Sequence, residues 1–482
     1  MEKAIEILNQ IIWSNFLIAF LFLTGLYFSI KTRFLQFRLL KKMFRALYKS
    51  KASKTGVSSF QAFALDLSGR IGTGNIAGVA TAIAWGGPGS VFWMWMIALI
   101  GSATAFAEAT LGQLYKEVKD GEYRGGPAFY IQKGIGKRWY AILFALTLMA
   151  ANGLGTSGIQ SNSIADGMFN AFNIPPLLTG IGLAVVLGLI IFGGVHRIAK
   201  TAQLIVPFMG ISYLIVATVI IFINFTQIPA VLKLIVESAF GMEATLGGIV
   251  GSAISWGVKR GMFSNEAGQG TAPHASAAAE VKHPAQQGLV QAFSVYIDTI
   301  LICTATAFII LFSGIYNVED GTGGYLIQNA PGISAGTGFT QAGIDYYFPG
   351  WGTPFVAIAL LMFAFTSLLA IYYRVETNFS FLFKDNIPKK ALIILRLIVL
   401  SAIVYGASNK VEMAWKFGDI GVGLITWLNL IALFLLRKPI LKCFKDYEDQ
   451  LKQNKEPVFD SLKAGIKNAV FWEKKEINKE AD

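Results

Sequence analysis

Apolar runs long enough to cross a bilayer recur along the chain from Ile11 to Leu436, with only short polar interruptions. A helix needs about 20 mostly apolar residues to span the hydrocarbon core. By this measure the sequence predicts an all-α polytopic membrane protein with eleven transmembrane helices, at about 11–31, 59–84, 88–115, 139–160, 177–195, 201–224, 233–262 with breaks, 286–314, 351–383, 391–408 and 415–436. The first run has no basic segment before it and no small-residue cleavage site, so we interpret it as a retained span.

Composition and charge agree with this pattern. The 482 residues are 54% hydrophobic and only 15% charged, against roughly 25% charged in a soluble domain. The net charge of +12 does not indicate a nucleic-acid partner, because the basic residues gather in alternate loops. This positive-inside pattern predicts an N-terminus outside and a C-terminus in the cytoplasm. The two cysteines imply no disulfide framework.

Two groups of five spans follow the first span. We expect an extra N-terminal helix and basic loop at 1–58, a first five-helix repeat at 59–232, a second repeat at 233–437 and a cytoplasmic tail at 438–482. Five crossings reverse direction, so the second group starts on the opposite face of the membrane. That is the arrangement of an inverted repeat, in which substrate and ions bind where the helices are interrupted.

Glycine interrupts the first span of each group. The segment "DLSGRIGTGNIAG" from Asp66 to Gly78 contains four glycines, each of which costs a helix roughly 1 kcal/mol relative to alanine. Freed carbonyls can coordinate a cation, and freed N–H groups can hold a carboxylate. The glycines also fit close helix packing, and Asp66 and Arg70 are spaced to neutralise each other. They do not have the spacing of a dinucleotide-binding loop.

In the second group, the glycines in "GGIVGSAISWGVKRG" place the break at 247–252, with Gly247, Gly248 and Ser252 as candidate binding residues. The following segment, "GMFSNEAGQGTAPHAS", is rich in small residues and carries Glu266. That carboxylate is either a buried functional acid or a helix-capping surface acid. The depth of Glu266 in the membrane decides between these two roles.

Several polar side chains lie at mid-span. Thr366 and Ser367 place adjacent hydroxyls in one helix, which suits a weakly held monovalent cation if the hydroxyls do not simply bond to their own helix. Asn152 and Thr156 share a face with Gln160, as either the polar wall of a pocket or a helix-packing contact. Asp298 is costly in a membrane, and either pairs with a charge on a neighbouring span or lines the cavity.

The sequence gives little support to an enzymatic function. It has no Ser-His-Asp or Cys-His set, no paired catalytic carboxylates and no P-loop. His274 and His283 lie nine residues apart without cysteines or an H-E-x-x-H motif, so a metal site is not indicated. We expect no cofactor.

The segments "GRIGTGNIAGVATAIAWGGPGSVFWMW" and "KRGMFSNEAGQGTAPHASAAAEVKHPAQQG" resemble the alanine or glycine:cation symporter family, the bacterial and archaeal sodium:alanine symporters. The resemblance extends over nearly the whole chain. It implies sodium-coupled uptake of alanine or glycine across the cell membrane of a prokaryote. It also implies the five-plus-five inverted repeat of the amino acid–polyamine–organocation superfamily.

A weaker likeness to the sodium-coupled leucine transporters implies site residues. Its sodium ligands would correspond to the carbonyls of Ser68, Ile71 and Phe363 and the hydroxyls of Thr366 and Ser367. The substrate carboxylate would meet the backbone around Thr73, Gly74 and Asn75. That family's second sodium site also uses an asparagine matching Asn75, but its other ligands have no obvious match here, so we expect one sodium per cycle.

The function predicted from the sequence is therefore sodium-coupled symport of small neutral amino acids by alternating access. Phe365 and Trp256 are candidate walls that would limit the substrate to a small side chain, although bulky residues at mid-span also serve helix packing. The alternatives are a proton-coupled amino acid transporter, in which Glu266 or Asp298 relays protons, and an ion channel. The sequence leaves alanine versus glycine, enantiomer and oligomeric state open.

Overall fold

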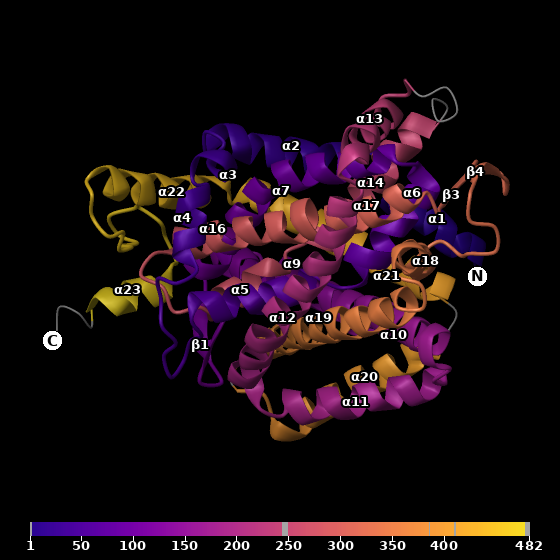
Figure 1. Ribbon diagram of the computed structural model, residues 1–482. Coiled ribbons are helices and arrows are strands. Elements are labelled where there is room, and N and C mark those ends of the chain that lie inside the picture. The colour runs from indigo at the N-terminus through magenta and orange to yellow at the C-terminus, as the bar shows by residue number, and fades with distance from the viewer. Residues whose placement is uncertain (1, 243–248, 385, 409–410, 478–482) are drawn as a thin grey trace.

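Helices form most of the computed structural model, which describes residues 2–242, 249–384, 386–408 and 411–477 (Figure 1). Within these residues, eight helical stretches are long and apolar enough to cross a membrane, and Pro176–Ile191 is a shorter apolar helix. Two further predicted spans are the interrupted ones, at 59–86 and from 250 onward. The predicted all-α polytopic class with interrupted helices is confirmed.

The N-terminal elements are α1 (Glu2–Ile12) and α2 (Asn15–Lys31), followed by the short helices α3 (Leu35–Arg38) and α4 (Leu40–Ala46). The next span consists of α5 (Ser59–Arg70), the π-helical turn η1 (Gly74–Gly78) and α6 (Val79–Gly86). A capping box between Ser58 and Gln61 starts α5, because each side chain satisfies a backbone N–H that the first helical turn leaves free.

The rest of the first half contains α7, a hairpin, five further α-helices and two π-helical turns. Their bounds are α7 (Gly89–Leu114), β1 (Glu117–Lys119), β2 (Glu122–Arg124), α8 (Pro127–Tyr130), η2 (Ile131–Ile135), α9 (Arg138–Ala150), η3 (Ala151–Thr156), α10 (Ser157–Phe172), α11 (Pro176–Ile191) and α12 (Gly194–Ile223). Strands β1 and β2 pair antiparallel, with Val118 opposite Tyr123.

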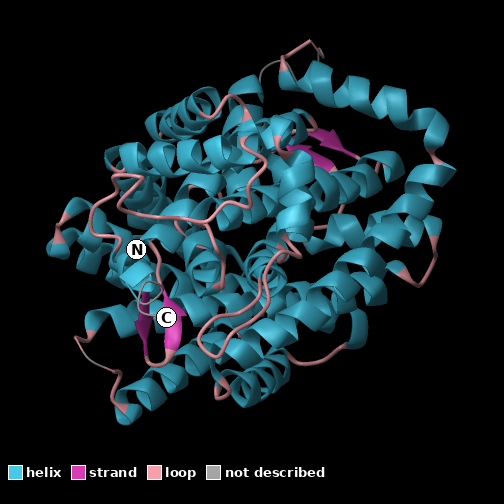
Figure 2. Cartoon of the chain, turned by 90° about the vertical axis from the view of Figure 1, so that its left-hand side faces the viewer, coloured by secondary structure: helices cyan, strands magenta, loops and turns pink. Residues whose placement is uncertain are grey.

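The second half begins with η4 (Phe225–Gln227) and α13 (Ile228–Ala239), then α14 (Val250–Asn265) and α15 (Ala272–Ala278). It continues with α16 (Pro284–Val295), η6 (Tyr296–Cys303), α17 (Thr304–Ser313), β3 (Asn317–Glu319), β4 (Tyr325–Gln328), α18 (Thr337–Tyr347), α19 (Gly352–Leu382), α20 (Lys389–Ala407), α21 (Val411–Leu435), α22 (Arg437–Lys452) and α23 (Val470–Ile477). Strands β3 and β4 form the second antiparallel hairpin (Figure 2).

The predicted second break at 247–252 lies only partly within the described residues. Gly247 and Gly248 lie outside the described residues, and Ser252 lies inside α14, which runs uninterrupted from Val250 to Asn265. The chain also leaves the helix at 266–271, a second helix break that was not predicted from the sequence. Gly268 and Gly270 there have φ of +94° and +78°, a conformation that glycine adopts at little cost.

Glycine serves another purpose within α14. A Cβ on Gly257 would lie 2.4 Å from the Ser90 carbonyl oxygen of α7. This glycine therefore permits close helix packing, which explains why the glycine content of the segment was a misleading sign of unwinding.

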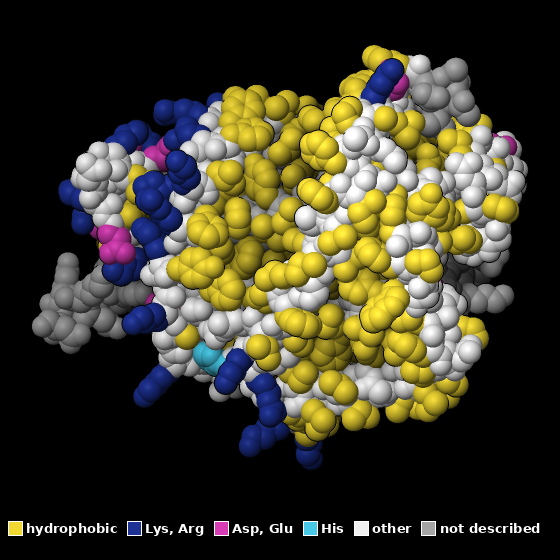
Figure 3. Space-filling view, viewed as in Figure 1, with side chains coloured by type: hydrophobic (Ala, Val, Ile, Leu, Met, Phe, Trp, Pro, Cys, Tyr) yellow, Lys and Arg dark blue, Asp and Glu magenta, His cyan; other side chains and the backbone are white. Residues whose placement is uncertain are grey.

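The interrupted spans lie in the centre of the helical assembly. Helix α7 packs against α14 and α16, and α19 packs against α5 and α10. On the outside, apolar side chains of α12 such as Leu204 and Phe222 are exposed. Apolar side chains cover the middle of the molecule in Figure 3, and Lys and Arg gather at the end where α22 and α23 lie. The N-terminus lies toward the other end (Figure 1).

Candidate substrate and cation site

Three helices, α5, α10 and α19, approach one another closely at the first helix break. Helix α5 ends at Arg70, and helical structure resumes at Gly74. A Cβ on Gly72 would lie 2.5 Å from Ser367 Oγ on α19 and 2.9 Å from Gln160 Oε1 on α10. Only glycine leaves room for this close approach.

Side-chain oxygens satisfy the N–H groups that the break frees. The Gly72 N–H donates to Asn75 Oδ1 at 2.8 Å, and the Thr73 N–H donates to Gln160 Oε1 at 3.1 Å. The Thr73 hydroxyl is buried and has no hydrogen-bond partner among the described residues. A buried polar atom without a partner is costly, so this hydroxyl is suited to meeting a ligand.

The two hydroxyls of α19 lie against the same break. Ser367 Oγ is 3.2 Å from the Ile71 carbonyl oxygen and 3.1 Å from that of Phe363. Thr366 Oγ1 donates to the Phe363 carbonyl at 2.9 Å. Both hydroxyls therefore bond to their own helix, which is the alternative left open from the sequence, and Ser367 also reaches the first break. Ser68 is also buried, in the last turn of α5. Four of the five predicted cation ligands are thus joined by hydrogen bonds, and all four contribute oxygen.

Asp298 meets the other side of the first break. Its carboxylate accepts hydrogen bonds from Asn75 Nδ2 at 2.7 Å, Ser264 Oγ at 2.9 Å and Thr299 Oγ1 at 2.6 Å. It forms no ion pair among the described residues, and it does not line the cavity between the two breaks. Neutral donors from two neighbouring elements therefore surround this carboxylate, and the charge of Arg70 on α5 acts on it without a direct ion pair.

Three π-helical turns contribute to this region. Asn75 lies in η1, Thr156 in η3 and Asp298 in η6. A π-turn inserts a residue into the helical ladder, and such turns occur frequently at functional sites. Sequence reasoning did not predict them.

A small cavity lies between the two helix breaks. Its walls combine glycine, polar and apolar side chains from α5, η1, η3, α10, α14, the segment 266–271, α19 and α21: Gly69, Arg70, Gly74, Thr156, Gln160, Phe263, Glu266, Gln269, Ile371 and Val422. Its free volume of about 10 Å³ is enough only for a single water molecule. The cavity is therefore closed in this structure, and its polar and apolar groups could surround a small amino acid only after the walls move apart.

The predicted substrate residues are distributed over several places. Gly74 and Thr156 line the small cavity, whereas Asn152 is buried in η3 without lining it. Phe365 belongs to the apolar core, and Trp256 and Ser252 line a different, larger cavity. The apolar walls of the small cavity are Phe263, Ile371 and Val422, which only the three-dimensional packing could identify.

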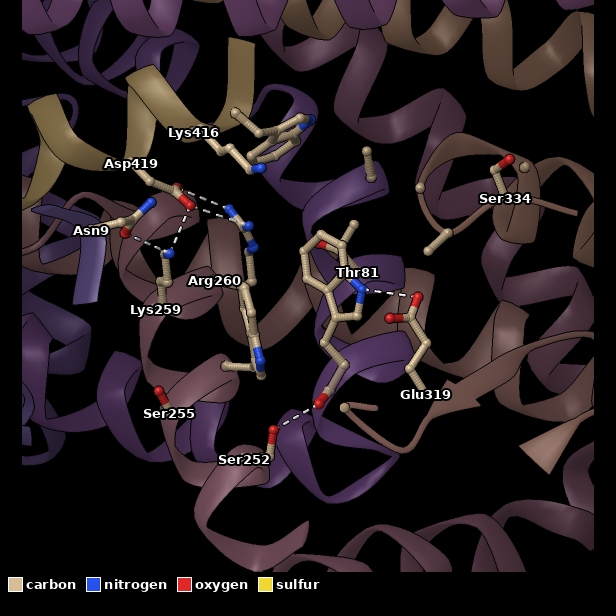
Figure 4. Close-up of a pocket in the computed structure, with 18 of the residues that line it drawn as sticks. Asn9, Thr81, Ser252, Ser255, Lys259, Arg260, Glu319, Ser334, Lys416 and Asp419 are labelled. Atoms are coloured by element: carbon tan, nitrogen blue, oxygen red, sulfur yellow. Dashed lines mark hydrogen bonds and ion pairs between the residues drawn. The ribbon is translucent and has the colours of Figure 1, made fainter. Parts of the chain in front are cut away.

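The larger cavity is a vestibule of about 1340 Å³ at the end of the molecule where the N-terminus lies (Figure 4). Asp419 accepts ion pairs from Lys259 at 2.7 Å and Arg260 at 3.1 Å. The Arg260 guanidinium stacks on Trp415 at 4.4 Å, and Trp415 in turn contacts Phe263, with ring centroids 5.0 Å apart. Because Trp415 lines the vestibule and Phe263 lines the small cavity, this aromatic pair separates the two.

Ion pairs close the opposite side of the small cavity. Glu266 binds Arg374 through both carboxylate oxygens, at 2.7 and 2.6 Å. Arg70 Nε is 2.6 Å from Asp66 Oδ2, which confirms that Asp66 and Arg70 neutralise each other. Glu266 is only 8% exposed, so it is a buried acid and not a surface cap. A Cβ on Gly69 would clash with the Arg374 guanidinium, so a larger residue there would displace one partner of this ion pair.

The described residues contain no group of three or more His, Cys, Asp or Glu side chains that could hold a metal ion. A chain with two interrupted membrane helices, a cavity between them, a vestibule on one side and ion pairs on the other has the form of a membrane transport protein.

Comparison with known proteins agrees with this class. The sodium:alanine symporter family matches residues 1–461, so the chain belongs to that family and is a transporter and not an enzyme. It is 56% identical to YrbD of Bacillus subtilis (strain 168), provisionally assigned as a sodium/proton-dependent alanine carrier, with 98% of each chain covered. It is 51% identical to the sodium/proton-dependent alanine carrier protein of Bacillus sp. (strain PS3), over 89% of this chain and 97% of that protein.

Another relative has a different substrate in its name. GlnT of Bacillus subtilis (strain 168), provisionally a sodium/glutamine symporter, is 46% identical over 95% of this chain and 93% of its own. Among solved structures, the manganese transporter of Eremococcus coleocola has a TM-score of 0.53 and 14% identity, covering 84% of this chain and 94% of that chain. This likeness supports the fold alone.

Proposed function

We propose that this protein is a secondary active transporter that couples the entry of sodium to the uptake of alanine by alternating access. The observation that carries the proposal is the first helix break, where Ser367 meets the Ile71 carbonyl while the adjoining Gly74 lines the cavity between the two breaks. Sodium and substrate would therefore bind to neighbouring parts of one backbone segment. The names of the relatives favour alanine and a coupling cation.

Sodium would bind among the carbonyls of Ser68, Ile71 and Phe363 and the hydroxyls of Thr366 and Ser367. Hard cations prefer such oxygen ligands. These side chains carry no charge, which suits an ion that must leave on the inner side. Binding would tie α19 to the break after α5 and so order the segment that the substrate needs.

Alanine would bind in the small cavity once its walls move apart, because the present free volume of about 10 Å³ is too small for an amino acid. The segment from Thr73 to Asn75 would meet its carboxylate, and the unpaired Thr73 hydroxyl supports this placement. Phe263, Ile371 and Val422 would surround the methyl group. Glycine would fit the same space with less apolar contact, so we expect weaker binding of glycine.

The open vestibule and the closed ion pairs correspond to the outward-facing state of the cycle. In this orientation the N-terminus is outside and the basic C-terminal end is in the cytoplasm of a bacterial cell, as positive charge on the inner side favours. Inward opening would then require Glu266 to separate from Arg374.

Proton coupling is the second candidate, and the Asp298 environment favours it. This carboxylate is fully buried, with neutral donors in place of a cation. Burying a charge without a partner is costly, so a proton is one ion that could occupy the site. It would act in addition to sodium or in its place.

The test is uptake of labelled alanine into proteoliposomes under an inward sodium gradient, with potassium replacement and a proton gradient as comparisons. Ser367→Ala and Thr366→Ala should lose most sodium-dependent uptake. Ser212→Ala is the matched control, because its exposed hydroxyl on α12 donates to its own helix at Phe208 and should be dispensable. Uptake driven by protons alone would replace the sodium proposal with its alternative. No uptake of alanine would refute both.

A further inference from the structure

Helix α7 contains a buried carboxylate that the proposed transport site does not use. Glu108 is fully buried, and among the described residues it forms no ion pair with Lys, Arg or His. Its oxygens accept hydrogen bonds from the Gly268 N–H at 3.4 Å, the Gly270 N–H at 3.1 Å and Asn429 Nδ2 at 2.9 Å. Two of these three donors are backbone groups of the second helix break.

The surrounding geometry holds the break against Glu108. Gly268 and Gly270 adopt left-handed conformations, which direct both N–H groups to one carboxylate. Asn429 on α21 also donates to the Gly268 carbonyl at 2.9 Å and accepts a hydrogen bond from the Tyr130 hydroxyl. Glu108 thus ties the segment 266–271 to α7 and, through Asn429, to α21.

This segment also forms part of the transport pathway. Glu266 and Gln269 line the small cavity, and Glu266 forms the ion pair with Arg374 that closes the inner side. The segment must move for the inner side to open. A group that fixes its backbone therefore controls that step.

We propose that Glu108 is a proton-sensitive latch on inward opening. This inference rests on the proposed transport function. The ionised carboxylate accepts from all three donors and holds the segment 266–271 in place. A proton on one oxygen turns an acceptor into a donor that faces N–H groups, so the protonated form releases a backbone N–H and lets the segment move.

The charged and titratable groups that face Glu108 from neighbouring elements are few. Arg70 and Asp66 lie on α5 and pair with each other. The Tyr130 phenol lies on α8 and is bonded to Asn429. The carboxylate of Glu266, at the start of the segment itself, is held by Arg374. Glu108 is the member of this group without a countercharge of its own, and a proton can fill that role.

The experiment compares sodium-driven alanine uptake in proteoliposomes, from mildly acidic to mildly alkaline conditions, for the wild type, Glu108→Gln and Glu108→Asp. In the wild type, uptake should rise several-fold as the pH falls, because protonation releases the latch. Glu108→Gln cannot ionise, so its uptake should not depend on pH. Glu108→Asp keeps the titratable group and should retain the pH dependence.

Glu376→Gln is the matched control, because Glu376 is a buried carboxylate on α19 that is paired with Arg124 at 2.8 Å. Its pH profile should keep the wild-type shape even if the rate is lower. Hydrogen exchange provides a second readout that does not depend on turnover. The amides of 266–271 should exchange faster in Glu108→Gln than in the wild type, and faster in the wild type at lower pH after correction for intrinsic exchange.

The outcomes separate this inference from the function it rests on. A wild type that takes up alanine with sodium, while Glu108→Gln keeps a wild-type pH profile and unchanged exchange at 266–271, would overturn the latch alone. Uptake in the wild type that does not vary with pH would do the same. A wild type that neither binds nor transports alanine would overturn the proposed function instead.

Discussion

The two helix breaks differ in length and in the chemistry that holds them. The first spans only 71–73, and neutral groups on α10, α19 and η1 satisfy its backbone. The second spans 266–271, and charged groups hold it: Glu108 accepts its N–H groups, while its own Glu266 pairs with Arg374. Neutral oxygens suit reversible binding of a cation and a zwitterion, whereas buried ion pairs suit a closed gate. We therefore interpret the first break as the binding element and the second as the gate.

The largest expected effect comes from filling the first break. Gly72→Ala would place a Cβ 2.5 Å from Ser367 Oγ and 2.9 Å from Gln160 Oε1, so both side chains would have to shift at the proposed sodium site. Overpacking costs about 1–3 kcal/mol, so sodium-dependent alanine uptake should fall by about 5- to 150-fold.

Gly182→Ala on α11 is the control for this change, because no atom lies within 4 Å of its added Cβ. Uptake by this variant should match the wild type. If Gly72→Ala transports alanine as well as Gly182→Ala does, the first break is not the binding element.

Breaking the gate should affect stability more than binding. Glu266→Gln leaves the Arg374 guanidinium buried without its countercharge, a change that costs about 3–5 kcal/mol in buried pairs. The melting temperature of the purified protein should fall clearly. The double variant Glu266→Gln with Arg374→Gln should recover part of the loss, because the unpaired charge is gone. Single and double variants with strictly additive effects would show that the two residues do not act as a pair.

A smaller and more selective effect is expected at the cavity wall. Phe263→Ala removes a ring that lines the small cavity, so alanine should bind about tenfold more weakly and longer neutral side chains such as glutamine should gain access. One methylene in an apolar pocket is worth about 1–3 kcal/mol of discrimination. Competition of unlabelled amino acids against labelled alanine measures this change.

Phe365→Ala is the matched control for that experiment. Phe365 lies in the apolar core and not in the small cavity, so its truncation should lower stability without changing the order of preferred substrates. A change of selectivity in Phe365→Ala, with none in Phe263→Ala, would support the sequence-based prediction that Phe365 lines the substrate pocket.

The smallest expected effect is the protection of the Cys303 thiol from chemical labelling when ligands bind. This thiol is buried 3.2 Å from Ser264 Oγ and 3.4 Å from Asn75 Nδ2, between the two breaks. In a Cys443→Ser background, small thiol reagents should label Cys303 slowly, and sodium with alanine should slow the labelling further by holding the break in place. Labelling that is the same with and without both ligands would argue against binding at this position.

The sequence predicted the spans and the first break well, because apolar length and clustered glycines are local signals. Thr366 and Ser367 were also recognisable as paired hydroxyls at mid-span. The break at 266–271 was not predicted, because glycine has two uses: Gly257 allows α14 to approach α7, and Gly268 and Gly270 provide left-handed backbone. The number of glycines in a segment does not distinguish these two uses.

The rest of the site depends on contacts between distant segments. Asp298 meets Asn75 across more than two hundred positions of the sequence, and Phe263 lines the cavity only because α14 packs beside η1. Glu108 is the one acidic residue in the apolar run 88–115, and it was not singled out from the sequence. Its partners at Gly268 and Gly270 become evident only when α7 lies against the second break.

The most direct test of the central claim is equilibrium binding of labelled alanine to the purified protein at a series of sodium concentrations, repeated for sodium binding with and without alanine. If both ligands bind at the first break, sodium should tighten alanine binding and alanine should tighten sodium binding by the same factor. Potassium should not substitute for sodium, and Ser367→Ala should abolish the effect. Alanine binding that is equally tight with and without sodium would contradict the account.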